Sequence, residues 1–174
     1  MSVLKIAGLI CMIAGGAGVG YSMSVQVGRR YRQLQALQRM AAFLMGEITY
    51  ANTPLPEALK HTAQRMEEPF ASFLEELVKE MMKFPSRTFA ELFEQSVYRC
   101  LGASSLEKKD LEMLCHMGTS LGYLDRQMQL RTLQLYETEL KQEVMTAYEV
   151  MPGRQKLYQT LGIMGGLFLV ILFL

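Results

Sequence analysis

The chain has few residues of the types that catalysis or metal binding requires. It contains two histidines, His61 and His116, and three cysteines, Cys11, Cys100 and Cys115. Cys115 and His116 are adjacent, so on a helix they point about 100° apart and do not readily share a ligand. The cysteine spacing matches neither a disulfide framework nor a closed zinc site. A site formed by Cys100 and His61 in the fold stays open, but a buried thiol and a half-exposed histidine are the simpler interpretation.

Paired carboxylates occur only in segments rich in lysine and glutamine. Three such pairs are Glu67–Glu68, Glu75–Glu76 and Glu137/Glu139. A solvated helix face explains them better than acid–base chemistry does. The chain also lacks HExxH, CxxC and GxSxG motifs and a phosphate-binding glycine loop. The sequence therefore predicts no catalytic residue, cofactor or metal ion, and a membrane-bound enzyme with an unrecognised site is the alternative.

Apolar residues recur at helical spacing through the middle of the chain. The first such stripe consists of Leu34, Leu37, Ala41, Leu44 and Ile48. Arg39 and Glu47 are expected to face away from this stripe. Comparable stripes occupy later segments, and no segment alternates apolar and polar residues as a strand does. The sequence predicts an all-α body of about six helices, and the short links between them favour an antiparallel bundle.

Several residues mark where the helices of this body begin. Thr53 is expected to cap the second helix, with Pro54 at its first helical position and Glu57 in its first turn. Thr88-Phe-Ala-Glu91 and Ser104-Ser-Leu-Glu107 have the spacing of capping boxes, in which the first and fourth residues bond each other's backbone. These motifs predict the starts of three helices.

Glycine and proline predict where helices end or change course. Gly102 is expected to end the helix that starts at Thr88. Gly118 and Gly122 are expected to interrupt helix, and a long helix then begins at Tyr123. Pro152-Gly153 is expected to break or kink that helix.

Both ends of the chain are apolar. Residues 6–28 and 157–174 contain no charged side chain. Eighteen residues in a helix reach about 27 Å, close to the roughly 30 Å of hydrocarbon in a bilayer. We expect transmembrane helices at 1–28 and 156–174 around a cytoplasmic domain at 29–155. A cleaved signal peptide is the alternative for the first, although its cations would precede the apolar stretch.

Basic residues flank the apolar ends on the side of the body. Arg29, Arg30 and Arg32 follow the first end, and Arg154 and Lys156 precede the second. The positive-inside rule then puts the body in the cytoplasm and both termini on the non-cytoplasmic side. The body between these flanks carries 12 Lys and Arg against 17 Asp and Glu. This pattern fits contact between the flanks and anionic lipid and argues against a nucleic-acid surface.

Glycines stand four residues apart in both apolar ends. Gly16 and Gly20 form one such pair, and Gly162 and Gly166 form the other. This spacing lets helices approach closely in lipid. We expect the two spans to pack on each other or on partner helices, although glycine is also common in membrane helices for other reasons.

Two stretches of the body are more tightly specified than packing requires. One is a turn and helix start that contains Thr53, Pro54, Leu55, Pro56 and Glu57. The other follows Gly122 and contains Asp125, Arg126 and Gln127. The sequence predicts partner contacts at both, and a dipole role at a helix start is the simpler interpretation of Asp125.

The combination of these elements resembles the stage III sporulation protein AB family. The matching parts are the glycine-rich N-terminal span with its arginines, Ile48-Thr-Tyr-Ala-Asn-Thr-Pro-Leu-Pro-Glu-Ala-Leu59, Leu121-Gly-Tyr-Leu-Asp-Arg-Gln127 and Leu161-Gly-Ile-Met-Gly-Gly-Leu-Phe-Leu-Val-Ile-Leu172. The resemblance covers essentially the whole chain, and its specificity comes from the combination, because no single motif is chemically diagnostic.

The resemblance implies a non-enzymatic scaffold rather than a catalyst. Its helical body is expected to be similar to the cytoplasmic domain of the type II secretion inner-membrane F protein. The family implies a place in the mother-cell membrane around the forespore, within a channel or feeding apparatus required for endospore formation. The implied partners are the other stage III AA–AH membrane proteins and a cytoplasmic hexameric ATPase, with no nucleic acid and no small-molecule substrate. A generic helical membrane adaptor is the alternative.

Overall fold

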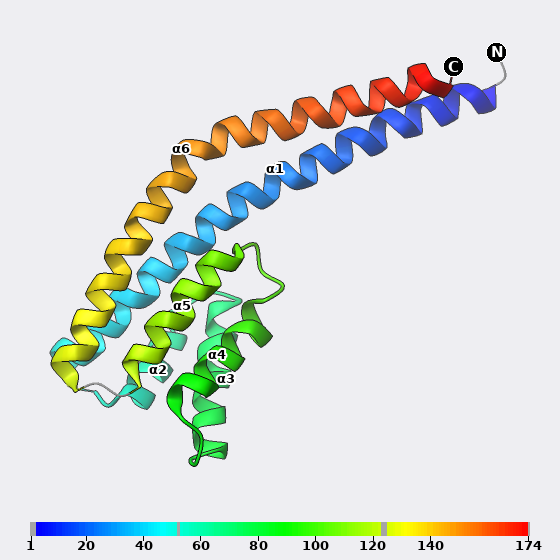
Figure 1. Cartoon of the computed structure of the whole chain (residues 1–174). Coiled ribbons are helices and arrows are strands. Elements are labelled where there is room, and N and C mark those ends of the chain that lie inside the picture. Colours follow the sequence, from blue (N-terminus) through cyan, green and yellow to red (C-terminus); the bar gives the residue numbers. More distant parts are fainter. Residues whose placement is uncertain (1–2, 52, 123–124, 174) are drawn as a thin grey trace. The chain divides into compact units, whose positions relative to one another are not determined.

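The computed structural model describes residues 3–51, 53–122 and 125–173, without the side chains of residues 3–13, 17, 169, 172 and 173. The elements in chain order are α1 (Val3–Gly46), η1 (a π-helical turn, Glu47–Ala51), α2 (Leu55–Ala63), α3 (Phe70–Lys83), α4 (Phe89–Leu101), α5 (Lys108–Leu121) and α6 (Arg126–Phe173) (Figure 1). The described residues form six α-helices and no strand, so the prediction of an all-helical chain is confirmed.

The chain divides into two compact units. The bundle unit comprises Arg32–Met145, and the helix-pair unit comprises Met1–Tyr31 with Thr146–Leu174. The long helices α1 and α6 contribute residues to both units. Of the break or kink predicted at Pro152-Gly153, the break is wrong, because α6 continues through Pro152 to Phe173; the kink stays a prediction. Proline removes one backbone hydrogen bond of a helix, and the bonds on either side keep this long helix continuous.

No helix among the described residues combines the length and the apolar character that crossing a membrane requires. The structure therefore does not support the two predicted spans. Residues 1–2 and 174 and the side chains of 3–13, 17, 169, 172 and 173 lie outside the described part of those segments.

The core of the bundle unit consists of the apolar stripes that the sequence predicts. In α1, Leu34, Leu37, Ala41 and Leu44 are at most 1% exposed, and Ile48 of η1 joins them. The later helices add Ala58, Leu59, Phe70, Phe73, Leu74, Leu77, Leu92, Phe93, Val97, Leu101, Leu111, Leu114, Leu133 and Leu140. Successive helices pack on each other, α2 on α3, α3 on α4 and α4 on α5. This nearest-neighbour packing is the arrangement expected of a bundle with short links.

The predicted helix boundaries are partly confirmed. Thr88 caps α4 by accepting a hydrogen bond from Glu91 N at 3.3 Å, and Gly102 follows its end. The second capping box is formed by Glu107 and Asp110 rather than Ser104 and Glu107. The predicted box was misplaced by three residues because a carboxylate also accepts a backbone N–H bond at this position. Tyr123, the predicted start of α6, lies outside the described residues.

Gly118 does not interrupt a helix as predicted. It lies inside α5, where a Cβ atom would come within 2.1 Å of Phe93 Cδ1. Phe93 is 1% exposed and also contacts Phe73, with ring centroids 5.4 Å apart. The glycine is therefore a packing residue that makes room for a core aromatic ring, and only Gly122 stands at the end of α5.

Candidate functional site

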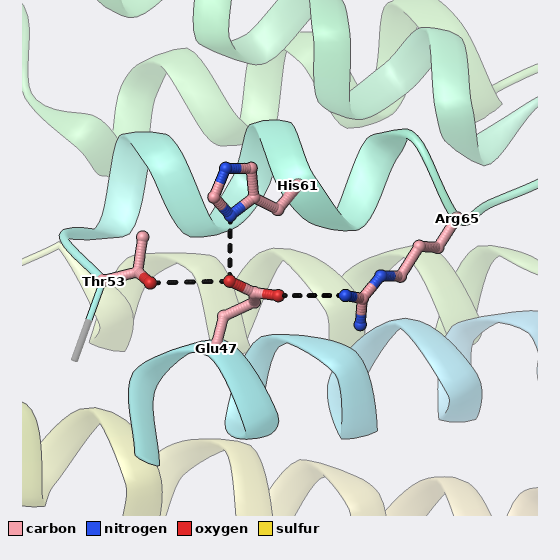
Figure 2. A network of polar contacts seen from close by, with 4 residues as sticks. All are labelled: Glu47, Thr53, His61 and Arg65. Atoms are coloured by element: carbon pink, nitrogen blue, oxygen red, sulfur yellow. Dashed lines mark hydrogen bonds and ion pairs between the residues drawn. The ribbon is translucent and has the colours of Figure 1, made fainter. Parts of the chain in front are cut away.

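Glu47 is the centre of a polar network in the bundle unit (Figure 2). It is the first residue of η1, and its side chain is 10% exposed. Its carboxylate accepts hydrogen bonds from His61 Nδ1 at 2.9 Å and from Thr53 Oγ1 at 3.4 Å. Arg65 Nη2 lies 3.6 Å from the other carboxylate oxygen. A carboxylate at this depth requires such partners, because desolvation disfavours its charged form.

The network keeps Glu47 ionised at neutral pH. The hydrogen bond from His61 is the main cause that lowers the pKa of the Glu47 carboxyl below its ordinary value. Burial opposes this effect, while the charges of His61 and Arg65 and the Thr53 bond add to it. A general base that works near pH 7 would need a raised pKa instead. Glu47 is therefore suited to tying helices together, here η1 to α2.

Glu47 also fixes the turn that leads into α2. Thr53 N donates to the Glu47 carbonyl oxygen at 3.3 Å, in addition to the bond from its hydroxyl to the carboxylate. Thr53 does not cap α2 as predicted, because Glu47 engages its side chain, and the cap position is taken by Pro54. The residue before a proline is disfavoured in helical conformation, which separates η1 from α2.

The segment Thr53–Glu57, called the proline loop below, is presented to solvent. Pro54, Pro56 and Glu57 are exposed, whereas Thr53 and Leu55 are half-buried. Ala58 and Leu59, which follow directly, are fully buried and hold the start of α2 against the core. The predicted partner-contact residues of this stretch therefore lie on the turn before α2 and on the first turn of that helix.

The second predicted stretch reaches the same part of the bundle unit. Arg126 Nη2 donates a hydrogen bond to the carbonyl oxygen of Thr49 in η1 at 2.6 Å. Carbonyl groups in the last turn of a helix have no partner within the helix, and Arg126 supplies one. The two stretches singled out in the sequence, Thr53–Glu57 and residues 125–127, thus meet at η1 although they are far apart in the chain.

The other residues of the second stretch have simpler roles. Asp125 precedes α6, and its Oδ1 accepts a hydrogen bond from Met128 N at 2.9 Å, which makes it the cap of this helix. Gln129 Nε2 donates to the Leu121 carbonyl at 3.2 Å and so bridges the connection between α5 and α6. Gln127 is exposed. The helix-start interpretation of Asp125 accounts for its position.

The proline loop and Arg126 meet at η1, a place called the η1 junction below. Two features of this junction were not predicted from the sequence. Glu47 was expected to face away from the core, yet it is 8% exposed, because His61 of α2 and Arg65 in the turn after α2 cover it. Tyr50 is 90% exposed, the highest value among the large apolar residues described. Its position two residues after buried Ile48, about 200° around a helix, was the available indication.

His116 lies in a different setting, beside a small hollow between α5 and α6. The hollow has a volume of about 50 Å³ and is also lined by Ser120, Thr132, Tyr136 and Glu139. Ligand pockets usually have volumes of about 300–1,000 Å³. The hollow thus has room for a few water-sized groups and not for a substrate.

Cys115 is a weak candidate for nucleophilic chemistry. Burial, followed by the charges of Glu94 and Glu112, raises the pKa of its thiol to about 11. The thiolate is the reactive and metal-binding form, so little of it is present at neutral pH. Across the described residues, no three His, Cys, Asp or Glu side chains gather in an arrangement that holds a metal ion.

In the helix-pair unit, the predicted glycine positions face one another. A Cβ atom on Gly16 would lie 2.7 Å from the Gly162 carbonyl oxygen and 2.9 Å from Gly166 Cα. A Cβ atom on Gly20 would lie 2.5 Å from the carbonyl oxygen of Tyr158. Later residues of α1 contact earlier residues of α6, so the two helices are antiparallel in this unit. Backbone meets backbone here, an approach that only glycine permits.

One buried hydroxyl adds a polar contact to this pair. Ser24 is 4% exposed, and its Oγ accepts a hydrogen bond from Gln159 Nε2 at 3.3 Å. Gln155 Nε2 donates to the Ser24 carbonyl oxygen at 3.4 Å. Further along, the rings of Tyr31 and Tyr148 contact each other at a tilt of 42°, with centroids 5.7 Å apart. These contacts fix the register of the two helices together with the glycines.

The basic residues predicted to flank a membrane lie mainly at the surface. Arg29, Arg32, Arg154 and Lys156 are exposed, and Arg30 is half-buried. No acidic residue lies between Lys5 and Tyr31 or from Met151 onward. Arg32 is the first residue of the bundle unit, and the other four basic residues give the helix-pair unit positive charge where α1 and α6 contain them.

Comparison with known proteins gives concordant matches. The sequence model of the family described as stage III sporulation protein AB matches residues 5–174. Stage III sporulation protein AB of Bacillus subtilis (strain 168) is 28% identical over 173 residues, which is 97% of this chain and 98% of that protein. A solved structure of stage III sporulation protein AB aligns with a TM-score of 0.64 at 27% identity, and covers 71% of this chain and 97% of the solved one.

Proposed function

Because the chain belongs to the stage III sporulation protein AB family, we propose that it is a non-enzymatic scaffold of a secretion-like assembly required for endospore formation. Family membership assigns the chain a role in sporulation, and the family is not named for an enzyme. In the proposed role, the bundle unit is a platform similar to the cytoplasmic domain of the type II secretion F protein. It docks the cytoplasmic hexameric ATPase of the stage III set.

The observation that carries this proposal is the junction at η1. Two predicted contact stretches, the proline loop and residues 125–127, are drawn to one turn by Glu47 and Arg126. The resulting surface is exposed yet fixed by hydrogen bonds and an ion pair. A preorganised surface of this kind reduces the entropy lost on binding, which favours a protein-docking role.

The proposal includes a membrane location. The body would lie in the mother-cell cytoplasm at the outer forespore membrane, with both termini on the other side and the AA–AH membrane proteins as neighbours. Its support is the uncharged sequence of residues 6–28 and 157–174 and the basic residues beside them. Cations at the cytoplasmic ends of apolar helices are attracted by anionic lipid.

Binding of the purified ATPase to the full-length chain in detergent tests this function. We expect saturable binding, and Glu57→Lys in the proline loop should weaken it by about tenfold, because reversing a charge at the rim of an interface changes the encounter and adds repulsion. Glu75→Lys, a reversal at an exposed position of α3, is the matched control and should leave binding within about twofold.

Either of two outcomes would contradict the proposal. One is that the unaltered chain shows no saturable binding to the ATPase, and the other is that both charge reversals weaken binding equally. Melting curves of the two variants provide the folding check, since both residues are exposed and neither forms part of the core.

A further inference from the structure

Tyr50 is a highly exposed residue of the η1 junction that neither the fold nor the polar network around Glu47 requires. Its neighbour Ile48 is 2% exposed and packs in the core, whereas Tyr50 itself is 90% exposed. An aromatic ring in water gives up the 150–250 Å² of burial that such rings usually contribute. The fold therefore gains little from this side chain as the isolated chain presents it.

The backbone on both sides of Tyr50 is held in place. On one side, Arg126 binds the Thr49 carbonyl at 2.6 Å. On the other side, Thr53 N binds the Glu47 carbonyl at 3.3 Å and its hydroxyl binds the Glu47 carboxylate. His61 and Arg65 in turn fix that carboxylate. An exposed aromatic ring is thus mounted on a turn that three helical elements, α1 with η1, α2 and α6, hold still.

We infer that Tyr50 is the residue by which this junction anchors a partner protein, and this inference rests on the proposed docking function. Tyrosine is among the residues that dominate binding energy at protein interfaces, since it has a large apolar ring, a polar tip and few rotatable bonds. Holding its backbone still lowers the entropy lost when the ring enters a pocket. The partner supplies an apolar pocket for the ring and a hydrogen-bonding group for its hydroxyl.

Two acidic residues of the stretches that meet at η1 indicate the chemistry of that pocket's rim. Glu57 ends the exposed proline loop, and Asp125 directly precedes the arginine that holds Thr49; both are exposed. Arg126 is engaged with the Thr49 carbonyl, and Glu47 is already paired. Complementarity therefore favours a partner with basic residues around its pocket, and repulsion by these two carboxylates disfavours an anionic lipid surface.

The test compares Tyr50→Ala with Met82→Ala in the full-length chain in detergent, with the purified stage III ATPase as the probe. Met82 is 72% exposed on α3 and controls for the loss of an exposed apolar side chain. We expect Tyr50→Ala to weaken binding about 30-fold, which is the loss typical of an anchor residue, and Met82→Ala to leave it within about twofold. Tyr50→Phe should lie between the two if the hydroxyl finds a partner. Melting temperatures should be unchanged, because both side chains are exposed.

The outcomes separate this inference from the function on which it rests. If the unaltered chain fails to bind the ATPase, both are overturned. If it binds, and Tyr50→Ala binds equally well, the docking function stands and the inference about Tyr50 is wrong. If Tyr50→Ala and Met82→Ala weaken binding equally, the loss is not specific to the junction, and the inference is again wrong.

Discussion

Each of the two units of the chain is stabilised internally by a different kind of packing. In the bundle unit, large side chains fill the core, and Phe70, Phe73 and Phe93 are at most 1% exposed. In the helix-pair unit, the described contacts bring Gly16 and Gly20 against the backbone of α6. Burial of apolar area is the main source of stability in the bundle unit, whereas close backbone contact and hydrogen bonds are the main source in the helix-pair unit. A glycine consequently has a different meaning in each unit.

Gly118 and Gly20 illustrate that difference. A Cβ atom on Gly118 would meet the ring of Phe93, which is a side chain. A Cβ atom on Gly20 would meet the carbonyl of Tyr158 at 2.5 Å, which is backbone. A side chain shifts more readily than a helix backbone does. The bundle unit uses glycine to seat an aromatic ring, and the helix-pair unit uses it to seat another helix.

The largest expected effect is the loss of a core ring in the bundle unit. Phe73 is fully buried and meets Phe93 edge to face, with an interplanar angle of 89°. Phe73→Ala should lower the free energy of unfolding by about 3–5 kcal/mol, because it removes buried apolar area and leaves a cavity. Phe84→Ala, at a ring that is 37% exposed, should cost about 1 kcal/mol or less. Denaturant unfolding of the full chain measures both, and equal losses would refute a core role for Phe73.

A bulky residue at Gly20 should separate the helices of the other unit. Gly20→Val places a side chain against the Tyr158 carbonyl and Gly162 Cα, neither of which can yield without moving α6. Disulfide formation between Ser24→Cys and Gln159→Cys, in a chain whose natural cysteines are replaced, reports on this contact, because the hydrogen bond from Gln159 Nε2 to Ser24 Oγ at 3.3 Å shows that these two positions face each other. We expect the disulfide yield to fall several-fold.

Gly15→Val is the matched control for this substitution. A Cβ atom at Gly15 meets nothing within 4 Å, so the disulfide should form as before. If valine at both positions reduces the yield equally, a general effect such as loss of solubility explains the result, and the close-contact interpretation of Gly20 fails.

The role of a residue could be predicted from the sequence where it follows from helical periodicity, and not where it depends on one specific neighbour in the fold. Leu34, Leu37 and Leu44 were identified because burial on one face imposes the helical period on the sequence. Gly118 was misjudged because its role depends on Phe93, which is 25 residues away. The four-residue spacing of Gly16 and Gly20 indicated a helix contact, although the spacing itself leaves the partner helix open.

The junction at η1 was predictable only in part. The prolines and the polar residues after Gly122 marked two unusual stretches, because proline and helix-capping residues have fixed local roles. The bond from Arg126 to Thr49 joins residues 77 apart, and no local pattern encodes it. Glu47 was assigned to a polar face because helical period alone does not indicate that His61 of α2 and Arg65, two residues after its end, will cover it.

The smallest expected effect distinguishes the polar contacts of the two units by their response to acid. The pKa of Glu47 is lowered in the folded chain, chiefly by His61, so its stabilising effect is complete above the ordinary glutamate pKa of about 4.3 and is lost as pH falls through the folded value. Ser24, Gln155 and Gln159 do not titrate in this range, so acid should leave their contacts intact.

Unfolding free energy measured from pH 7 to 3 should therefore fall less steeply at the acid end in Glu47→Gln than in the unaltered chain. Glu57→Gln, at an exposed glutamate, should retain the unaltered slope. A Glu47→Gln curve parallel to that of the unaltered chain would show that the junction is not held by a charged Glu47, and the contrast between an ionic bundle junction and a neutral helix pair would then be lost.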